Sequence, residues 1–153
     1  MKKLLLILVA IAGLTIGANA QEKNIGLRFG GGDGGYGTEI SFQKGMGSNN
    51  RAELDLGFGS GDFFWLSGIY QWKFNLVDNF DWYAGAGARV GFCANHGVGV
   101  AVLGQVGIEY NFAELPFQVS LDVRPNFEFL LPTECWYRGA HWGGAALSIR
   151  YRL

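Results

Sequence analysis

Alternation of apolar and polar side chains is the feature that most constrains what this chain can fold into. The clearest case is the run 117–124, Phe-Gln-Val-Ser-Leu-Asp-Val-Arg, in which every second residue is apolar and the others are polar or charged. Successive side chains of a β-strand point to opposite faces, so this run predicts a strand with one apolar and one charged face. Similar runs recur along the chain, and together they predict an all-β fold.

The first twenty residues have the pattern of a secretory signal peptide. Two lysines precede the apolar run 4–14, and residues 18–20, Ala-Asn-Ala, form a cleavage site of the small-x-small type. A membrane-anchoring helix needs about 20 apolar residues, which is more than this run provides. We therefore predict a cleaved leader at 1–20 and a single exported domain at 21–153.

Composition narrows the class of protein further. The formal net charge of −1 becomes −3 without the two leader lysines, which is too small an excess to indicate a nucleic-acid partner. The 25 glycines alone would suit a disordered chain, but aromatic residues make up 15% of the sequence, and disordered segments lack them. Glycine and aromatics on alternating strands favour a small, tightly packed barrel.

Eight strand-like runs follow the leader, and most are separated by short turns rich in Gly, Asn and Asp. They predict an antiparallel, up-and-down barrel, and their lengths suit the roughly 9–11 residues of a tilted membrane-crossing strand. Pro125 has no N–H to donate, so it is expected at the barrel rim or at a bulge near the end of the seventh run. The runs are 24–32, 35–44, 50–59, 63–74, 80–93, 97–112, 116–128 and 141–153.

Alternation does not say which face points inward. A secreted, lipocalin-like binding barrel puts its apolar face inside, whereas a transmembrane barrel turns that face to lipid. Here the apolar face carries no charge, its aromatic residues gather toward the strand ends, and glycines lie on the polar face, where an eight-stranded interior is crowded. These three features favour the transmembrane β-barrel over the lipocalin-like alternative.

The polar face carries balanced charges. Eight strands enclose a packed interior, so we predict a closed network of ion pairs and hydrogen bonds in preference to a narrow porin-like channel. Such a network would also fix strand register, because a slip of one residue would turn the charges outward. The predicted members are Arg28, Glu39, Glu53, Asp55, Lys73, Arg89, Glu109, Asp122, Arg124 and Arg150.

Two segments, 82–92 (WYAGAGARVGF) and 104–112 (GQVGIEYNF), resemble small outer-membrane β-barrel proteins of the Bacteroidetes type. The wider similarity is to the eight-stranded class that includes the OmpA transmembrane domain and OmpX. This resemblance implies residence in the cell outer membrane, with its lipid and, during biogenesis, the barrel-assembly machinery as partners, and no cofactor. The final run is similar to the C-terminal signal which that machinery reads, although the class usually ends in an aromatic residue and this chain ends in Leu153. The resemblance implies no particular reaction or surface ligand.

Cys93 and Cys135 are placed by the predicted topology at the same end of the barrel, together with His96 and His141. In an oxidising compartment we favour a disulfide between the two cysteines. Unpaired thiols and a Cys/His zinc site are the alternatives, and the spacing matches no zinc motif, so no metal is predicted.

Residues for catalysis or binding also fall near that end. Ser60, His96, Glu134 and His141 would serve a lipid A- or lipid-acting enzyme, but nothing in their spacing brings a nucleophile to a base and there is no G-x-S-x-G elbow. We therefore predict a structural or surface-interaction role without catalysis.

The one long connection, 129–140, holds the candidate contact residues Trp136, Tyr137 and Arg138, which are of the types found at binding hot spots. A lid folded over the barrel mouth is the alternative explanation of this segment.

Overall fold

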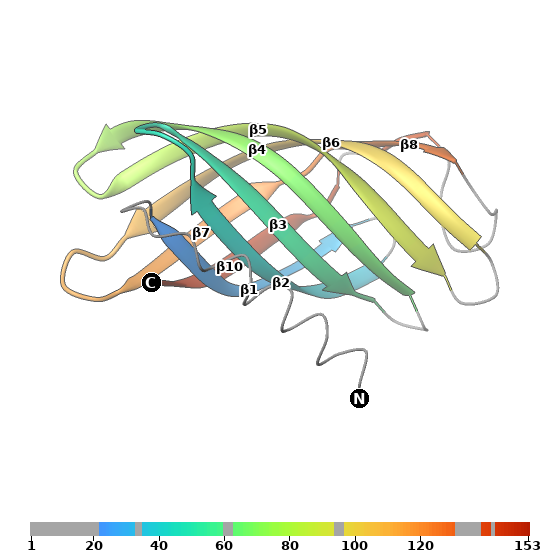
Figure 1. Cartoon of the computed structure of the whole chain (residues 1–153), viewed down its shortest axis with the longest axis horizontal. Helices are drawn as coiled ribbons and strands as arrows, with labels where there is room; N and C mark the ends of the chain where they lie inside the picture. Colours follow the sequence, from blue (N-terminus) through green and yellow to red (C-terminus); the bar gives the residue numbers. More distant parts are fainter. Residues whose placement is uncertain (1–21, 33–34, 60–62, 94–96, 131–138, 142) are drawn as a thin grey trace.

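The computed structural model describes residues 22–32, 35–59, 63–93, 97–130, 139–141 and 143–153. In these segments all regular structure is β, and no helix is long and apolar enough to cross a bilayer. The strands run at a tilt along the long axis of the molecule (Figure 1). They are β1 (Lys23–Gly32), β2 (Gly35–Gly45), β3 (Asn50–Phe58), β4 (Phe63–Val77), β5 (Phe80–Cys93), β6 (Gly97–Asn111), β7 (Phe117–Val123), β8 (Asn126–Leu130), β9 (Gly139–His141) and β10 (Ala145–Arg152).

The sheet closes into an eight-stranded antiparallel barrel, which confirms the predicted fold class. Strands β1 to β7 pair with their neighbours in sequence, and β10 completes the ring between β7 and β1. Strand β8 pairs with β6 in line with β7, and β9 pairs with β8 in line with β10. These two short strands therefore extend β7 and β10 and add no further strand to the ring. Every pairing between the described strands is antiparallel, as an up-and-down order requires.

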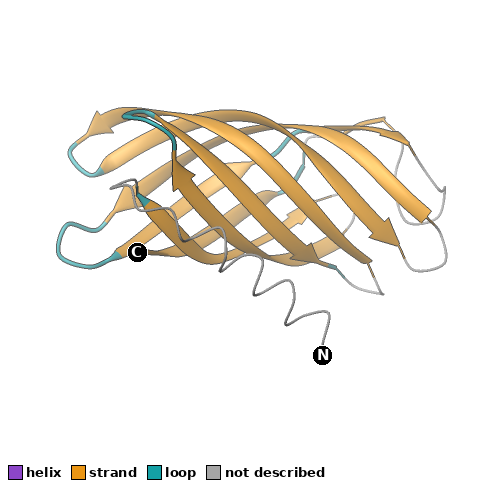
Figure 2. Cartoon of the chain, in the orientation of Figure 1, coloured by secondary structure: helices purple, strands orange, loops and turns teal. Residues whose placement is uncertain are grey.

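The three described hairpin turns and the C-terminus lie toward one end of the barrel, which we call the chain-terminal end (Figure 2). The tightest of these turns joins β4 to β5 through Asp78 and Asn79. Asp78 adopts φ 46°, a left-handed conformation that Asp tolerates, and its carbonyl accepts a 3.1 Å hydrogen bond from Asn75 Nδ2. The turn lies where the sequence predicts it.

Pro125 interrupts the seventh predicted run, 116–128, away from the rim, and of the two expected places it is the one beside a bulge, near the end of β7. Residues 124–125 separate β7 from β8. The register against β6 is nevertheless the same on both sides of the break, and the Gly104 N–H donates to the Pro125 carbonyl at 2.8 Å. The proline keeps its acceptor in the ladder and lacks only the donor that would return to the Gly104 carbonyl of the same neighbouring strand, β6.

The neighbour on the side away from β6, formed by β9 and β10, contains the irregularity. The registers of β10 with β7 and of β9 with β8 differ by one residue, so the bulge lies opposite Pro125 and not in its own strand. Gly143 lies in this bulge with φ 58°, and a Cβ there would come within 1.8 Å of the Arg124 carbonyl oxygen. A glycine is therefore required at this position. For the same reason the eighth predicted run, 141–153, is divided into β9 and β10.

The barrel has apolar side chains outside and polar side chains inside. On β7, Leu121 is 49% exposed, whereas its neighbour Asp122 is 2% exposed; on β6, Val106 is 51% exposed and Gln105 only 1%. The same alternation of exposure runs along β3 and β10. The core of this protein is therefore a polar one, enclosed by a wall whose outer surface is apolar.

Candidate functional site

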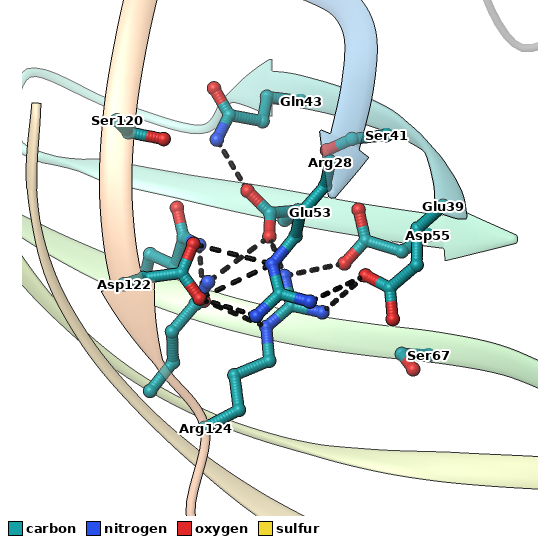
Figure 3. A network of polar contacts seen from close by, with 12 residues as sticks. Arg28, Glu39, Ser41, Gln43, Glu53, Asp55, Ser67, Ser120, Asp122 and Arg124 are labelled. Atoms are coloured by element: carbon teal, nitrogen blue, oxygen red, sulfur yellow. Dashed lines mark hydrogen bonds and ion pairs between the residues drawn. The ribbon is translucent and has the colours of Figure 1, made fainter. Parts of the chain in front are cut away.

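The polar interior is the candidate site, and the structure places all ten predicted residues in it. Figure 3 shows the part of it around Arg124. Eight are at most 5% exposed, while the side chains of Lys73 and Arg89 keep 18% and 15% of their accessible surface. The ten come from all eight strands of the barrel, so the contacts among them cross the lumen. Each residue occupies an inward-pointing position of its strand.

Arg124 is the centre of the network (Figure 3). It follows β7, and its guanidinium reaches strands β2 and β3 on the opposite wall. Nη1 contacts Glu39 Oε2 at 2.9 Å, and Nη2 contacts Asp55 Oδ2 at 2.6 Å and also binds Glu53. Nε lies 3.7 Å from Asp122 Oδ1. One cation is thus shared by carboxylates from three strands, in a geometry that the planar fork of arginine suits.

Arg28 joins the first strand to the seventh and the second. Its Nη2 donates to Asp122 Oδ1 at 2.6 Å, and its Nη1 donates to Glu39 Oε2 at 3.0 Å. Tyr83 Oη, from β5, adds a 3.3 Å hydrogen bond to the other oxygen of Asp122. The Asp122 carboxylate therefore has partners from β1 and β5.

Arg150 connects the last strand to the same network. Its Nε donates to Ser41 Oγ at 3.0 Å and its Nη1 to Ser120 Oγ at 2.7 Å, while Nη2 pairs with Glu53 Oε2 at 3.1 Å. Arg150 is fully buried. All three donor nitrogens have partners, which is the condition under which a buried guanidinium is tolerated.

A second cluster lies nearer the chain-terminal end, and its central residue was missed by the sequence analysis. Arg51 pairs with Glu109 Oε2 at 2.6 Å, donates from Nε to Gln71, and stacks 4.8 Å from the ring centre of Tyr83. It shares the inward face of β3 with Glu53, so continuing the alternation by one step toward the strand start would have identified it.

The same argument applies to Glu128. It is 7% exposed and lies on the inward face that continues from Asp122 and Arg124 into β8. The interruption at Pro125 hid this continuity in the sequence. The true network therefore contains more charged residues than the ten predicted.

Two large aromatic side chains also point inward, each next to a glycine of the neighbouring strand. Trp65 pairs in register with Gly57, where an added Cβ would lie 2.1 Å from the indole ring, and its Nε1 donates to Glu39 Oε1 at 2.7 Å. Tyr83 pairs in register with Gly107, where a Cβ would lie 2.6 Å from the hydroxyl. These glycines make room for the rings.

The remaining predicted site residues fall mostly outside the described segments. Cys93 ends β5 and is buried, but its expected partner is not described, so the disulfide stays a prediction. His141 is described only as part of the backbone of β9. Within the described part of the chain, no cluster of three or more His, Cys, Asp or Glu side chains is arranged to hold a metal. The residues outside the described segments are Ser60, His96, Glu134, Cys135, Trp136, Tyr137 and Arg138.

Several solved structures have the same architecture as this chain. The chain is similar to the N-terminal β-barrel domain of Pseudomonas aeruginosa OprF, with TM-score 0.67 and 12% identity over 86% of this chain and 97% of that one. It shares the fold of these barrels. Neisserial surface protein A matches with TM-score 0.60 at 12% identity, covering 87% and 96% of the two chains. A chain from the de novo design of transmembrane β-barrels matches with TM-score 0.62 at 11% identity, covering 86% and 95%. No protein-family model and no curated protein matches the sequence.

Proposed function

We propose that this protein is an integral outer-membrane β-barrel with a closed polar interior, and that its role is structural or one of surface interaction, without catalysis. The observation that carries this proposal is the reversed polarity of the barrel. Buried carboxylates and guanidiniums fill the interior, while Leu121, Val106 and Ile149 are each 46–51% exposed on the outer wall. In water so extensive an apolar surface promotes aggregation, whereas in a bilayer it is the surface that lipid requires.

The positions of the aromatic residues support the same proposal. Toward the chain-terminal end, Phe74 and Trp82 stack at 4.5 Å, and Phe80 lies 4.7 Å from Tyr110. Toward the opposite end, a second group contains the stacked pair Phe64–Phe92 at 5.1 Å and the pair Phe127–Phe129 at 4.8 Å. Two aromatic bands with an aliphatic zone between them match the two interfaces of a membrane.

The interior contacts argue against a narrow porin-like channel. Arg28 reaches Asp122 two strands away, and Arg124 and Arg150 reach Glu39 and Glu53 three strands away, so side chains from strands that are not neighbours meet in the lumen. An eight-stranded barrel has room for little more than these side chains. We therefore assign the charges to holding the barrel closed and in register.

A lipid-acting enzyme is the second candidate function. It rests on side chains that the structure does not describe, those of Ser60, His96, Glu134 and His141. A secreted lipocalin-like barrel needs its apolar face inside, and the structure has the opposite orientation. The surface contact assigned to Trp136, Tyr137 and Arg138, and the narrower resemblance to the Bacteroidetes type, rest on the sequence alone. The assembly signal in the last strand is proposed on the alternation of β10.

Gel migration of the protein from a detergent-solubilised outer-membrane fraction tests the proposal. We expect an unheated form that migrates faster than the heated one, since a closed barrel stays compact in detergent. Reconstituted vesicles should show no solute flux above that of empty vesicles. Recovery in the soluble periplasmic fraction would overturn the membrane location, and a stable conductance would overturn the closed interior.

A further inference from the structure

Two lysines face outward side by side at the chain-terminal end of the barrel. Lys23 on β1 and Lys44 on β2 are directly opposite each other in the antiparallel register. Their neighbours along the strands, Asn24 and Gln43, are buried in the lumen, so the two lysines occupy outward positions. Every other Asp, Glu, Lys and Arg of the described strands occupies an inward position. This lysine pair is therefore the only charge on the outer wall formed by the described strands.

The register brings these two like charges close together. The Gly45 N–H donates to the Glu22 carbonyl at 2.8 Å, so Lys23 and Lys44 form a non-hydrogen-bonded pair, the type in which facing side chains are closest. Like charges at directly opposite positions destabilise a sheet. Among the described residues Lys44 has no ion-pair partner, and its neighbour on β3 is Ala52. An anion bound beside the lysine pair would remove the repulsion.

The carboxylates near the lysine pair do not cancel its charge. Glu22 lies at the mouth of the barrel, where its Oε2 is 3.5 Å from Lys73 Nζ. Leu153, whose N–H donates to the Lys23 carbonyl at 2.7 Å, carries the terminal carboxylate on the β10 side of Lys23. Even with that carboxylate counted, two cations and one anion leave one positive charge in excess. A ligand with a single negative charge complements this excess.

The neighbours of the lysine pair on the outer wall are aromatic and aliphatic. Tyr151 of β10 is opposite Ile25 of β1, which makes it the diagonal neighbour of Lys23, and its ring meets that of Phe117 edge-on at 5.6 Å. Tyrosines of such a band lie where the lipid headgroups begin. Toward the middle of the barrel, the next outward positions of β1 are Ile25 and Leu27, which are 37% and 43% exposed. A ligand at the lysine pair therefore meets polar groups at the rim and apolar wall below it.

We propose that the lysine pair binds the phosphodiester of an anionic glycerophospholipid, of which phosphatidylglycerol is a simple example. The phosphate accepts from the ammonium groups of Lys23 and Lys44 and from the Tyr151 hydroxyl, and an acyl chain lies along Ile25 and Leu27. Phosphatidylcholine fits less well, because its own ammonium group cancels the charge of its phosphate. This inference rests on the proposed membrane location and adds a preferred lipid to it.

Native mass spectrometry of the detergent-solubilised barrel, mixed with equal amounts of phosphatidylglycerol and phosphatidylcholine, tests the proposal. Each basic residue near a membrane surface favours an anionic lipid about fivefold, so phosphatidylglycerol should be preferred as the first bound lipid by at least about fivefold. Inorganic phosphate at the same concentration should not displace it, because phosphate has no acyl chain. Equal binding of the two lipids would overturn the proposal, and displacement by phosphate would overturn the lipid as the ligand.

Substitutions outside the lumen locate the site without altering the interior network. Lys23→Gln and Lys44→Gln should each lower the lipid preference about fivefold, while Lys44→Arg should keep it. Glu114→Gln, in the exposed turn between β6 and β7, changes the charge of the same end by one unit and is the matched control, for which we expect no change. A gain from Glu114→Gln as large as the loss from Lys44→Gln would show that overall charge decides, and would overturn the site.

Unfolding in vesicles separates this proposal from the membrane location. In vesicles of phosphatidylcholine alone, Lys44→Gln should be no less stable than the parent, because it removes a repulsion. Adding phosphatidylglycerol should raise the denaturant midpoint of the parent more than that of Lys44→Gln. A barrel that inserts but shows no such difference overturns the lipid site alone, whereas a protein that inserts into neither kind of vesicle overturns the membrane location.

Discussion

Replacing Arg124 by methionine is the most direct test of what holds this barrel together. Methionine keeps much of the volume of the arginine stem but removes the cation that Glu39, Glu53 and Asp55 share. Breaking a buried ion pair by removing one partner costs about 3–5 kcal/mol, because the other partner is left buried and unpaired. Arg124 serves three buried carboxylates, so we expect a loss at the upper end, about 5 kcal/mol.

A second substitution, at Asp55, tests where that loss of stability comes from. Glu39 keeps Arg28, and Glu53 keeps Arg150, but among the described residues Asp55 has an ion pair with Arg124 alone. Asp55→Asn should therefore recover about 1–3 kcal/mol in the Arg124→Met background while being destabilising by itself. This coupling distinguishes an uncompensated charge from a simple loss of packing.

The assay is reversible denaturant unfolding in detergent micelles, followed by tryptophan fluorescence and by the heat-sensitive gel shift. Arg152→Met is the matched control, since among the described residues the Arg152 side chain at the rim donates only to the carbonyls of Phe112 and Leu115. Its loss should cost about 1–2 kcal/mol. An Arg124→Met protein within about 1 kcal/mol of the parent would refute the reasoning, because exposed pairs are worth that much. Additive effects of the two substitutions would also refute it.

Three further predictions concern the wall and one end of the barrel. Gly107→Val should destabilise the barrel by about 1–3 kcal/mol or more in the same unfolding assay, because the new side chain meets Tyr83, whereas Gly68→Ala should be close to neutral. Val106→Arg, near the middle of β6 on the outer wall, should cost about 2–4 kcal/mol in bilayers, and a cost below about 0.5 kcal/mol would contradict the lipid-facing assignment. Cys93→Ser should remove any mobility difference between reduced and non-reduced samples, and a parent protein that shows no such difference would contradict the disulfide.

Much of the fold follows from local sequence. Side-chain alternation identifies which residues point inward, since the period of two is a property of any strand, and turn residues such as Asp78 separate the strands where they do in the structure. The antiparallel order of hairpins follows from the short connections. These features need no knowledge of which strands meet across the barrel.

The ion pairs between side chains inside the barrel could not be predicted from local sequence. That Arg124 meets Glu39 and Asp55 depends on the tilt and stagger of the closed sheet, which a single strand does not encode. The interruption at Pro125 was expected, but its compensation by a bulge in the neighbouring strand is a property of two strands together. The like-charged pair of Lys23 and Lys44 likewise emerges only once β1 and β2 are placed in register.

The central charges are unevenly distributed along the sequence, and this affects how the barrel can close. The carboxylates Glu39, Glu53 and Asp55 belong to β2 and β3, early in the sequence. Two of the arginines that pair with them come late: Arg124 follows β7, and Arg150 lies on β10, the eighth strand of the ring. In an open sheet of the first six strands, Glu39 could still pair with Arg28, but Glu53 would lack both Arg124 and Arg150, and Asp55 would lack Arg124. Closure of the ring is therefore the step at which Glu53 and Asp55 gain these ion-pair partners, and before it two carboxylates would have to enter an apolar medium without them.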